Sequence, residues 1–192
     1  MPIAFAATLV ISYSVSSRGD VGRDLPAFAA LVRRAYADDR GWSLGGAVRF
    51  VQVPAGGDMA LWLAAPDAMT TFAGACSPSL SCRVGRDVVI NDERFRDGEP
   101  HWPGTLDDYR LEIINHETGH FLGLDHQVCD EPGAPAPVMM QQSKGLGPCV
   151  ANPWPLDDER VAAARLLSIA LPGGAIGSSF DPPATPGFAA AP

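Results

Sequence analysis

The stretch from His116 to His126 constrains this chain most, because three of its four histidines fall within it. His116 and His120 are four residues apart, which on an α-helix places both imidazoles on one face, one turn apart. Two nitrogens on one face can bind a zinc ion at about 2.0–2.1 Å each. Glu117 projects beside that ion, where it can take a proton from a zinc-bound water. Gly123 permits the positive φ that ends the helix, and the returning chain then delivers His126 as a third ligand.

Two alternative interpretations of these histidines are an ordinary structural role and a closed structural zinc site. Helix histidines are often ordinary structural residues, but here a glutamate and a glycine also stand where metal chemistry requires them. Five fixed positions are a far stronger signal than H-E-x-x-H alone. A closed structural zinc site usually has four protein ligands and favours cysteine, whereas three histidines with a spare glutamate indicate an open, catalytic site.

The full pattern H-E-x-x-H-x-x-G-x-x-H resembles the metzincin zinc peptidases. Some relatives of that group carry aspartate as the third ligand, so Asp125 is an alternative. It is one position short of that register, and we therefore expect His126. The resemblance also implies a tight turn with a methionine below the zinc site, and Met139 fits this better than Met140. Its soft side chain can form an apolar floor under three imidazoles; a core methionine without a special role is the alternative.

One part of the metzincin resemblance is missing. Several metzincin families place a tyrosine just after the turn methionine, where it binds zinc or stabilises the oxyanion. All tyrosines of this chain precede that region: Tyr13, Tyr36 and Tyr109. We therefore expect transition-state charge to rest on zinc, with Glu117 as the proton shuttle. Gln141 or Gln142 could donate a hydrogen bond to the same charge.

The four cysteines fall as two local pairs, Cys76 with Cys82 and Cys129 with Cys149. Neither pair has the C-x-x-C spacing of a zinc knuckle. We expect two disulfides, which imply an oxidising, extracytoplasmic setting and a secreted protein. Four free buried thiols are the alternative, and one cysteine could also bind the zinc as an inhibitory fourth ligand.

Hydrophobic periodicity predicts an α+β fold with a small, mixed, twisted sheet. Strands are expected at Ile3–Ser17, Val48–Val53, Met59–Ala65 and Asp87–Asn91. A backing helix from about Asp24 to Asp39–Gly41 and a short helix at Pro66–Phe72 accompany them. The segment from Cys76 to Cys82 is expected to be a small loop. Another loop is predicted from Asp92 to Thr105, and it contains His101, a surface residue rather than a ligand.

The active-site helix is expected to run from Leu106 to about Leu122. Prolines at 132, 135 and 137 then forbid long regular structure, and Asp157–Leu167 predicts one more amphipathic helix. We expect residues 1–170 to form a single metzincin-like catalytic domain. Residues 171–192 are rich in proline, glycine and alanine and are expected to be a poorly ordered tail.

The net charge of −8 argues against binding to nucleic acid or to an anionic membrane surface. Met1 to Ser12 is apolar but has no basic residue, so it is a poor signal peptide, and it is too short to span a membrane. We expect no membrane insertion within this chain, a monomer, and a peptide or protein as the substrate.

Beyond the motif, the chain resembles a group of uncharacterised secreted proteins from actinobacteria. The resemblance rests on Val88–Asn91, on the segment from Cys129 to Cys149 and on Asn152–Pro155, and it could cover residues from about 10 to 170. It implies a compact zincin-like fold whose C-terminal part holds the methionine turn and one helix. We therefore expect a zinc metalloendopeptidase. The alternatives are a zinc-bearing binding or structural module that no longer cuts, and an amidase acting on cell-wall peptide.

Overall fold

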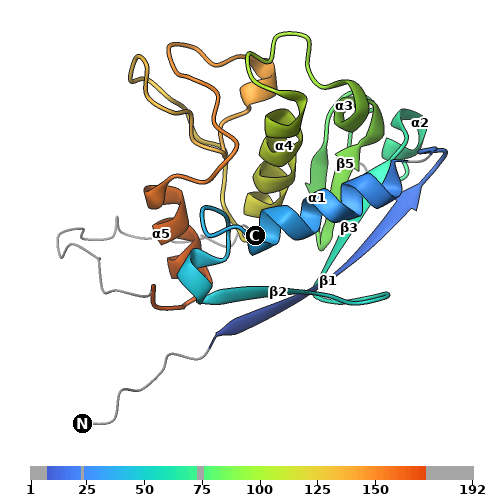
Figure 1. Ribbon diagram of the computed structural model, residues 1–192, viewed down its shortest axis with the longest axis horizontal. Coiled ribbons are helices and arrows are strands. Elements are labelled where there is room, and N and C mark those ends of the chain that lie inside the picture. Colours follow the sequence, from blue (N-terminus) through green and yellow to red (C-terminus); the bar gives the residue numbers. More distant parts are fainter. Residues whose placement is uncertain (1–7, 23, 73–75, 172–192) are drawn as a thin grey trace, which may run out of the picture.

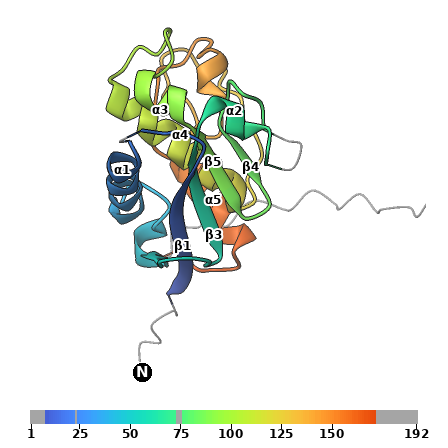
Figure 2. The same ribbon diagram turned by 90° about the vertical axis from the view of Figure 1, so that its right-hand side faces the viewer.

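A computed structural model of the chain describes residues 8–22, 24–72 and 76–171, which form a mixed sheet with helices packed on it (Figures 1 and 2). Its strands are β1 (Leu9–Arg18), β2 (Val48–Gln52), β3 (Met59–Ala64), β4 (Cys82–Val84) and β5 (Asp87–Asn91). Their order in the sheet is β2-β1-β3-β5-β4, and only β4 runs antiparallel to its neighbour. The prediction of a small mixed sheet with helices is confirmed.

The α-helices are α1 (Leu25–Ala37), α2 (Pro66–Met69), α3 (Asp92–Asp97), α4 (Leu106–Phe121) and α5 (Asp157–Leu166), and the short 3₁₀ turns are η1 (Leu44–Gly46) and η2 (Gln142–Lys144). Helices α1 and α4 share one hydrophobic core with the sheet, to which β3 contributes Leu61 and Leu63. Alternate residues of a strand lie on one face, so both helices cover the same face. On the opposite face, Met69 and Phe72 pack against Val89 of β5. The backing helix is therefore α1, as its apolar spacing predicts.

Local signals fix the two ends of α4. Thr105 accepts a hydrogen bond from the Asp108 backbone N–H, and Asp108 in turn accepts from Thr105, which forms a capping box. At the other end, Leu122 closes the last turn and Gly123 follows with φ of +99°. Only glycine adopts such a backbone readily, so the chain leaves the helix there. The predicted helix end and the predicted role of Gly123 agree with the structure.

Two short elements were missed by the sequence analysis. The loop predicted from Asp92 to Thr105 is wrong in its first part, because Asp92–Asp97 forms α3. Asn91 caps this helix by accepting from the Arg94 N–H, and Gly98 ends it with φ of +77°; these signals were outweighed by the prolines that follow. The segment after Cys76 is a loop as predicted, but Cys82 begins the three-residue strand β4, which is too short to show a period.

Other differences lie at element ends. Strand β1 runs from Leu9 to Arg18, and the residues predicted to precede it lie outside the described part of the chain, as does the predicted tail from residue 172 onward. The backing helix ends at Ala37, the short helix at Met69 and the last helix at Leu166. None of the described helices is long and apolar enough to cross a membrane.

Between α4 and α5 the chain is mostly irregular and runs alongside α4 (Figure 1). A second hydrophobic core joins it to the rest of the molecule. In that core Met139 from the irregular segment packs with Trp42, with Leu124 and with Ala163 and Ala164 of α5. The segment is therefore held from both sides, by α4 and by α5.

Candidate metal centre

Helix α4 carries three of the predicted site residues on its last two turns. His116 and Glu117 are buried, and His120 is half-buried. Two hydrogen bonds from α1 and the residues after it hold the helix in place. Tyr36 of α1 hydrogen-bonds Thr118 at 2.9 Å, and Trp42 donates to the Asn115 carbonyl at 3.0 Å. The side chains that face the metal site therefore project from a fixed backbone.

The three histidines predicted from the motif come together. Their candidate ligand nitrogens all lie within 4.8 Å of one another, and the Nε2 atoms of His120 and His126 are 3.1 Å apart. Two nitrogens at about 2.0–2.1 Å from a tetrahedral zinc ion are about 3.3 Å apart. His101, the fourth histidine, is exposed and lies outside this group.

The other ring nitrogen of two of these histidines is held by the backbone. His116 Nδ1 hydrogen-bonds the Val138 carbonyl at 2.7 Å, and His120 Nδ1 hydrogen-bonds the Leu124 carbonyl at 2.8 Å. A carbonyl can only accept, so each Nδ1 carries the proton and each Nε2 keeps its lone pair. This is the arrangement that orients histidine ligands in zinc proteins. The residues present therefore fit a zinc ion.

Burial governs the protonation of the cluster. It lowers the pKa of His116 to about 4 and also lowers the pKa of His120 and of His126, so all three imidazoles favour the neutral form that binds a metal. Burial raises the pKa of Glu117 to about 8, while the charge of Arg83 acts in the opposite direction. A cation held by the histidines would lower the pKa of this carboxyl, because opposite charge favours the ionised form.

His126 arrives on the segment that turns back after Gly123. The Leu124 N–H donates to the Gly119 carbonyl at 3.0 Å, and the Gln127 N–H donates to the Met139 carbonyl at 3.0 Å. These two bonds anchor the segment on either side of His126. Asp125, the alternative third ligand, is exposed and is not part of the cluster.

Met139 lies under the helix at the level of the histidines. It is fully buried, whereas Met140 is partly exposed, and the Met140 N–H closes a tight turn on the Pro137 carbonyl at 3.0 Å. The Met139 sulfur packs directly against Gly119, where a Cβ would collide with it. The absence of a side chain at Gly119 therefore leaves room for this methionine against the helix.

Glu159 of α5 hydrogen-bonds the backbone of the turn that contains Met139, and it was not identified from the sequence. Its carboxylate accepts hydrogen bonds from the backbone N–H groups of Val138 at 3.0 Å, Met139 at 2.7 Å and Leu156 at 2.7 Å. Burial raises the pKa of Glu159, and these three bonds act in the opposite direction. Because the Val138 carbonyl accepts from His116, the carboxylate of Glu159 is linked to this histidine through the peptide group between Val138 and Met139.

A cleft of about 520 Å³ opens in front of the cluster. The three histidines, Glu117 and Gln141 line one side, and the edge strand β4 with Arg83 lines the other. Of the two glutamines considered from sequence, Gln142 has its amide committed to the Pro137 and Asn152 backbone, so Gln141 is the one that faces the cleft. Arg83 was not identified from sequence, because the short strand that carries it was missed.

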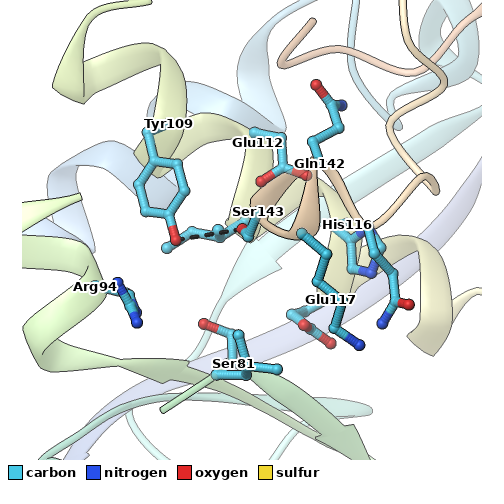
Figure 3. A pocket seen from close by; sticks show the side chains of 12 residues that line it. Ser81, Arg94, Tyr109, Glu112, His116, Glu117, Gln142 and Ser143 are labelled. Carbon is cyan, nitrogen blue, oxygen red and sulfur yellow. Dashed lines mark hydrogen bonds between the residues drawn. The ribbon is translucent and has the colours of Figure 1, made fainter. Parts of the chain in front are cut away.

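A smaller cavity of about 50 Å³ adjoins this cleft at His116 and Glu117 (Figure 3). Tyr109 and Glu112 from the preceding turns of α4 line it, together with Ser143. No tyrosine follows Met139 in the sequence, but Tyr109, which precedes it, places its hydroxyl 3.4 Å from the Ser143 hydroxyl in this cavity. Helical spacing from His116 could have identified Glu112, which is one turn earlier on α4.

The structure contains both disulfides expected from sequence. Cys76–Cys82 closes the loop before β4, and Cys129–Cys149 closes the loop that contains Met139. No free cysteine exists among the described residues. Two disulfides are typical of proteins in an extracytoplasmic environment.

Comparison with known proteins gives a family and a structural neighbour. Residues 5–164 match the model of the family DUF3152, which is described as protein of unknown function. No curated protein matches the chain. Among solved structures, the chain is similar to an archaemetzincin from Methanopyrus kandleri, with 17% sequence identity and a TM-score of 0.49. That match covers 82% of this chain and 96% of the archaemetzincin chain.

Proposed function

This chain belongs to the DUF3152 family, and we propose that it is a secreted zinc endopeptidase of the metzincin type. His116, His120 and His126 are the zinc ligands, and Glu117 is the general base. Met139 forms the methionine turn beneath them. The observation that carries the proposal is the set of three converging imidazoles, two of which hydrogen-bond a backbone carbonyl through Nδ1, with a carboxylate beside them in an open cleft.

The arrangement favours catalysis over a purely structural site. Zinc, when bound, supplies Lewis acidity that lowers the pKa of a water and polarises a carbonyl oxygen. Glu117 is adjacent to a ligand but projects into the cleft, where it can accept a proton and later return it to the leaving amine. A structural zinc site usually has four protein ligands. The described cluster has three.

The cleft suits an extended peptide. Among the described strands, β4 is the last of the sheet and pairs on one side only, with β5. An edge strand can bind a peptide by adding it as a further strand, through main-chain hydrogen bonds. Because β4 forms one wall of the cleft, a peptide bound there would run past Glu117 and the histidines.

Gln141 is our candidate for a hydrogen bond to the developing oxyanion. It lines the cleft next to Glu117, and no tyrosine follows Met139 in the chain. Preorganised donors aimed at the position of developing charge are a main source of transition-state stabilisation. We assign Gln141 this supporting role, with zinc as the principal stabiliser.

The test is hydrolysis of a diverse peptide library by the zinc-loaded protein, with and without a chelator. We expect cleavage that a chelator abolishes and that added zinc restores. Glu117→Gln should retain zinc, since no ligand is lost, and should lower turnover by about 10²–10⁴-fold, the usual contribution of a general base. Mass spectrometry of the library and elemental analysis of the protein provide the two readouts.

Other results would point elsewhere. Equal cleavage by the wild type and Glu117→Gln would remove Glu117 from the mechanism. Absence of any cleavage, with zinc bound in both proteins, would favour the non-cleaving binding module. Cleavage of cell-wall peptide amides alone would favour the amidase.

A further inference from the structure

The small cavity beside the metal centre contains an unpaired acid. Glu112 lies one helical turn before His116, and only 2% of its surface is exposed. Its Oε2 atom is buried and has no hydrogen-bond partner within the described residues. Figure 3 shows Glu112 among the side chains that line this cavity, with its carboxyl group on the side of Tyr109 and Ser143. An unpaired buried carboxyl destabilises the folded protein, and a bound partner that donates a hydrogen bond to it would offset that cost.

The neighbouring cations do not supply that partner. Arg94 lines the same cavity, but its guanidinium pairs with Glu99 at 2.8 Å and donates to the Ser79 carbonyl at 3.0 Å. Lys144 is exposed at the rim. Tyr109 is directed to Ser143. Within the described residues the carboxyl of Glu112 therefore lacks both a counter-ion and a donor.

The cavity is placed to receive a side chain of a bound peptide. It shares His116, Glu117 and Gln141 with the cleft, so a group that enters it belongs to a residue next to the reacting bond. Its volume of about 50 Å³ excludes bulky aromatic side chains and admits the end of an unbranched one. The net charge of −8 favours the approach of a basic peptide.

We propose that this cavity is a specificity pocket in which Glu112 binds the ammonium group of a substrate lysine adjacent to the scissile bond. The lysine methylenes lie along the walls formed by Leu80 and Ile113, and the ammonium donates to the carboxylate. Burial and the charge of Glu117 raise the pKa of the Glu112 carboxyl well above its usual range, and a lysine ammonium beside it would lower that pKa and favour the carboxylate, whereas an acidic side chain brings no such counter-charge. The inference rests on the proposed peptidase function, and it names the substrate class that the peptidase selects.

The experiment compares matched peptides that differ at one position beside the cleaved bond, with lysine, methionine or glutamate. We expect kcat/KM for the lysine peptide to exceed that for the methionine peptide by at least about tenfold, as for other buried charge pairs. Glu112→Gln should remove this preference, so that kcat/KM becomes similar for the lysine and the methionine peptides. Glu93→Gln makes the same charge change on the surface of α3 and should leave the preference intact.

Thermal stability tests whether Glu112 serves substrate binding or supports the fold. Glu112→Met removes an unpaired buried carboxyl, so its melting temperature should rise above that of the wild type. A fall would show that Glu112 supports the fold, and that result would overturn the proposal. Binding of the same peptides to zinc-loaded Glu117→Gln, followed by fluorescence anisotropy, tests the pocket without cleavage. Lysine-selective binding that depends on Glu112 supports the pocket even if the wild type cuts nothing, whereas absent or unselective binding refutes it.

Discussion

The two sides of the metal centre are built in different ways. Helix α4 supplies His116, Glu117 and His120 from one regular element, held by a capping box and by packing on the sheet. The segment between α4 and α5 supplies His126, the Val138 carbonyl and Met139, and it contains little regular structure. On the helical side, spacing alone sets the geometry. On the other side, each group is placed by an individual contact.

The contacts on the irregular side come from residues distant in sequence. Glu159 accepts from the backbone of Val138 and Met139, and Gln142 and Asn152 connect neighbouring parts of the segment through six hydrogen bonds. Each of these groups is buried or half-buried. A buried N–H without an acceptor costs about 1–3 kcal/mol, so loss of one carboxylate there affects several groups at once. The irregular side is thus the more fragile half of the site.

The largest expected effect concerns the metal and applies to both sides. His120→Ala removes a helical ligand and His126→Ala removes the ligand from the irregular segment. Either change should leave little zinc after treatment with a mild chelator, because two ligands rarely retain it. Elemental analysis measures the zinc content. His101→Ala is the matched control, since this exposed histidine lies outside the cluster, and it should retain about one zinc per chain.

The second-largest expected effect concerns Glu159 and distinguishes the irregular side of the metal centre from the helical side. Glu159→Ala leaves three backbone N–H groups without their acceptor, so the free energy of unfolding should fall by at least about 3 kcal/mol. Zinc affinity should fall by about 10–100-fold, because the Val138 carbonyl that orients His116 loses its support. Denaturant titration and competition with a chelator measure the two quantities.

Two further variants complete that experiment. Glu159→Gln keeps one acceptor oxygen and should lie between the wild type and Glu159→Ala in both measurements. Glu131→Ala removes an exposed glutamate from the same irregular segment and should change stability by less than about 0.5 kcal/mol. Unchanged zinc affinity in Glu159→Ala would show that the irregular segment positions His116 without help from α5.

The same contrast explains what could be predicted from sequence. The residues His116, Glu117 and His120 follow from a local period, and Gly123 marks its end, so their place near the C-terminal end of one helix could be predicted from sequence. The mixed sheet and α1 follow from apolar periodicity in the same way. Strand β4 and helix α3 were missed because elements of three and six residues carry too little pattern.

The groups that sequence analysis missed act through long-range contacts. Glu159 lies 20 residues beyond Met139, and its position at the start of α5 indicates only the local partner Leu156. Glu112 appears as one polar residue among the apolar positions of α4, and only the structure shows that its carboxyl faces a cavity. Local patterns predict which residues share a helix face, whereas the placement of single side chains from other elements depends on tertiary packing.

The smallest effect compares the two disulfides. Cys129–Cys149 closes a loop with a sequence separation of 20 on the irregular side, and Cys76–Cys82 closes one of 6 beside β4. The chain-entropy estimate gives about 3 kcal/mol for the longer loop and about 2 kcal/mol for the shorter. Replacement of each pair by serine, with denaturant unfolding, should show this order, and non-reducing mass mapping should recover both pairings. Because the longer loop contains Met139 and supports His116, its loss should also weaken zinc binding, while loss of the shorter loop should leave zinc affinity unchanged. Equal effects on zinc would mean that β4 contributes to metal binding as much as the irregular segment does, and the contrast between the two sides would then fail.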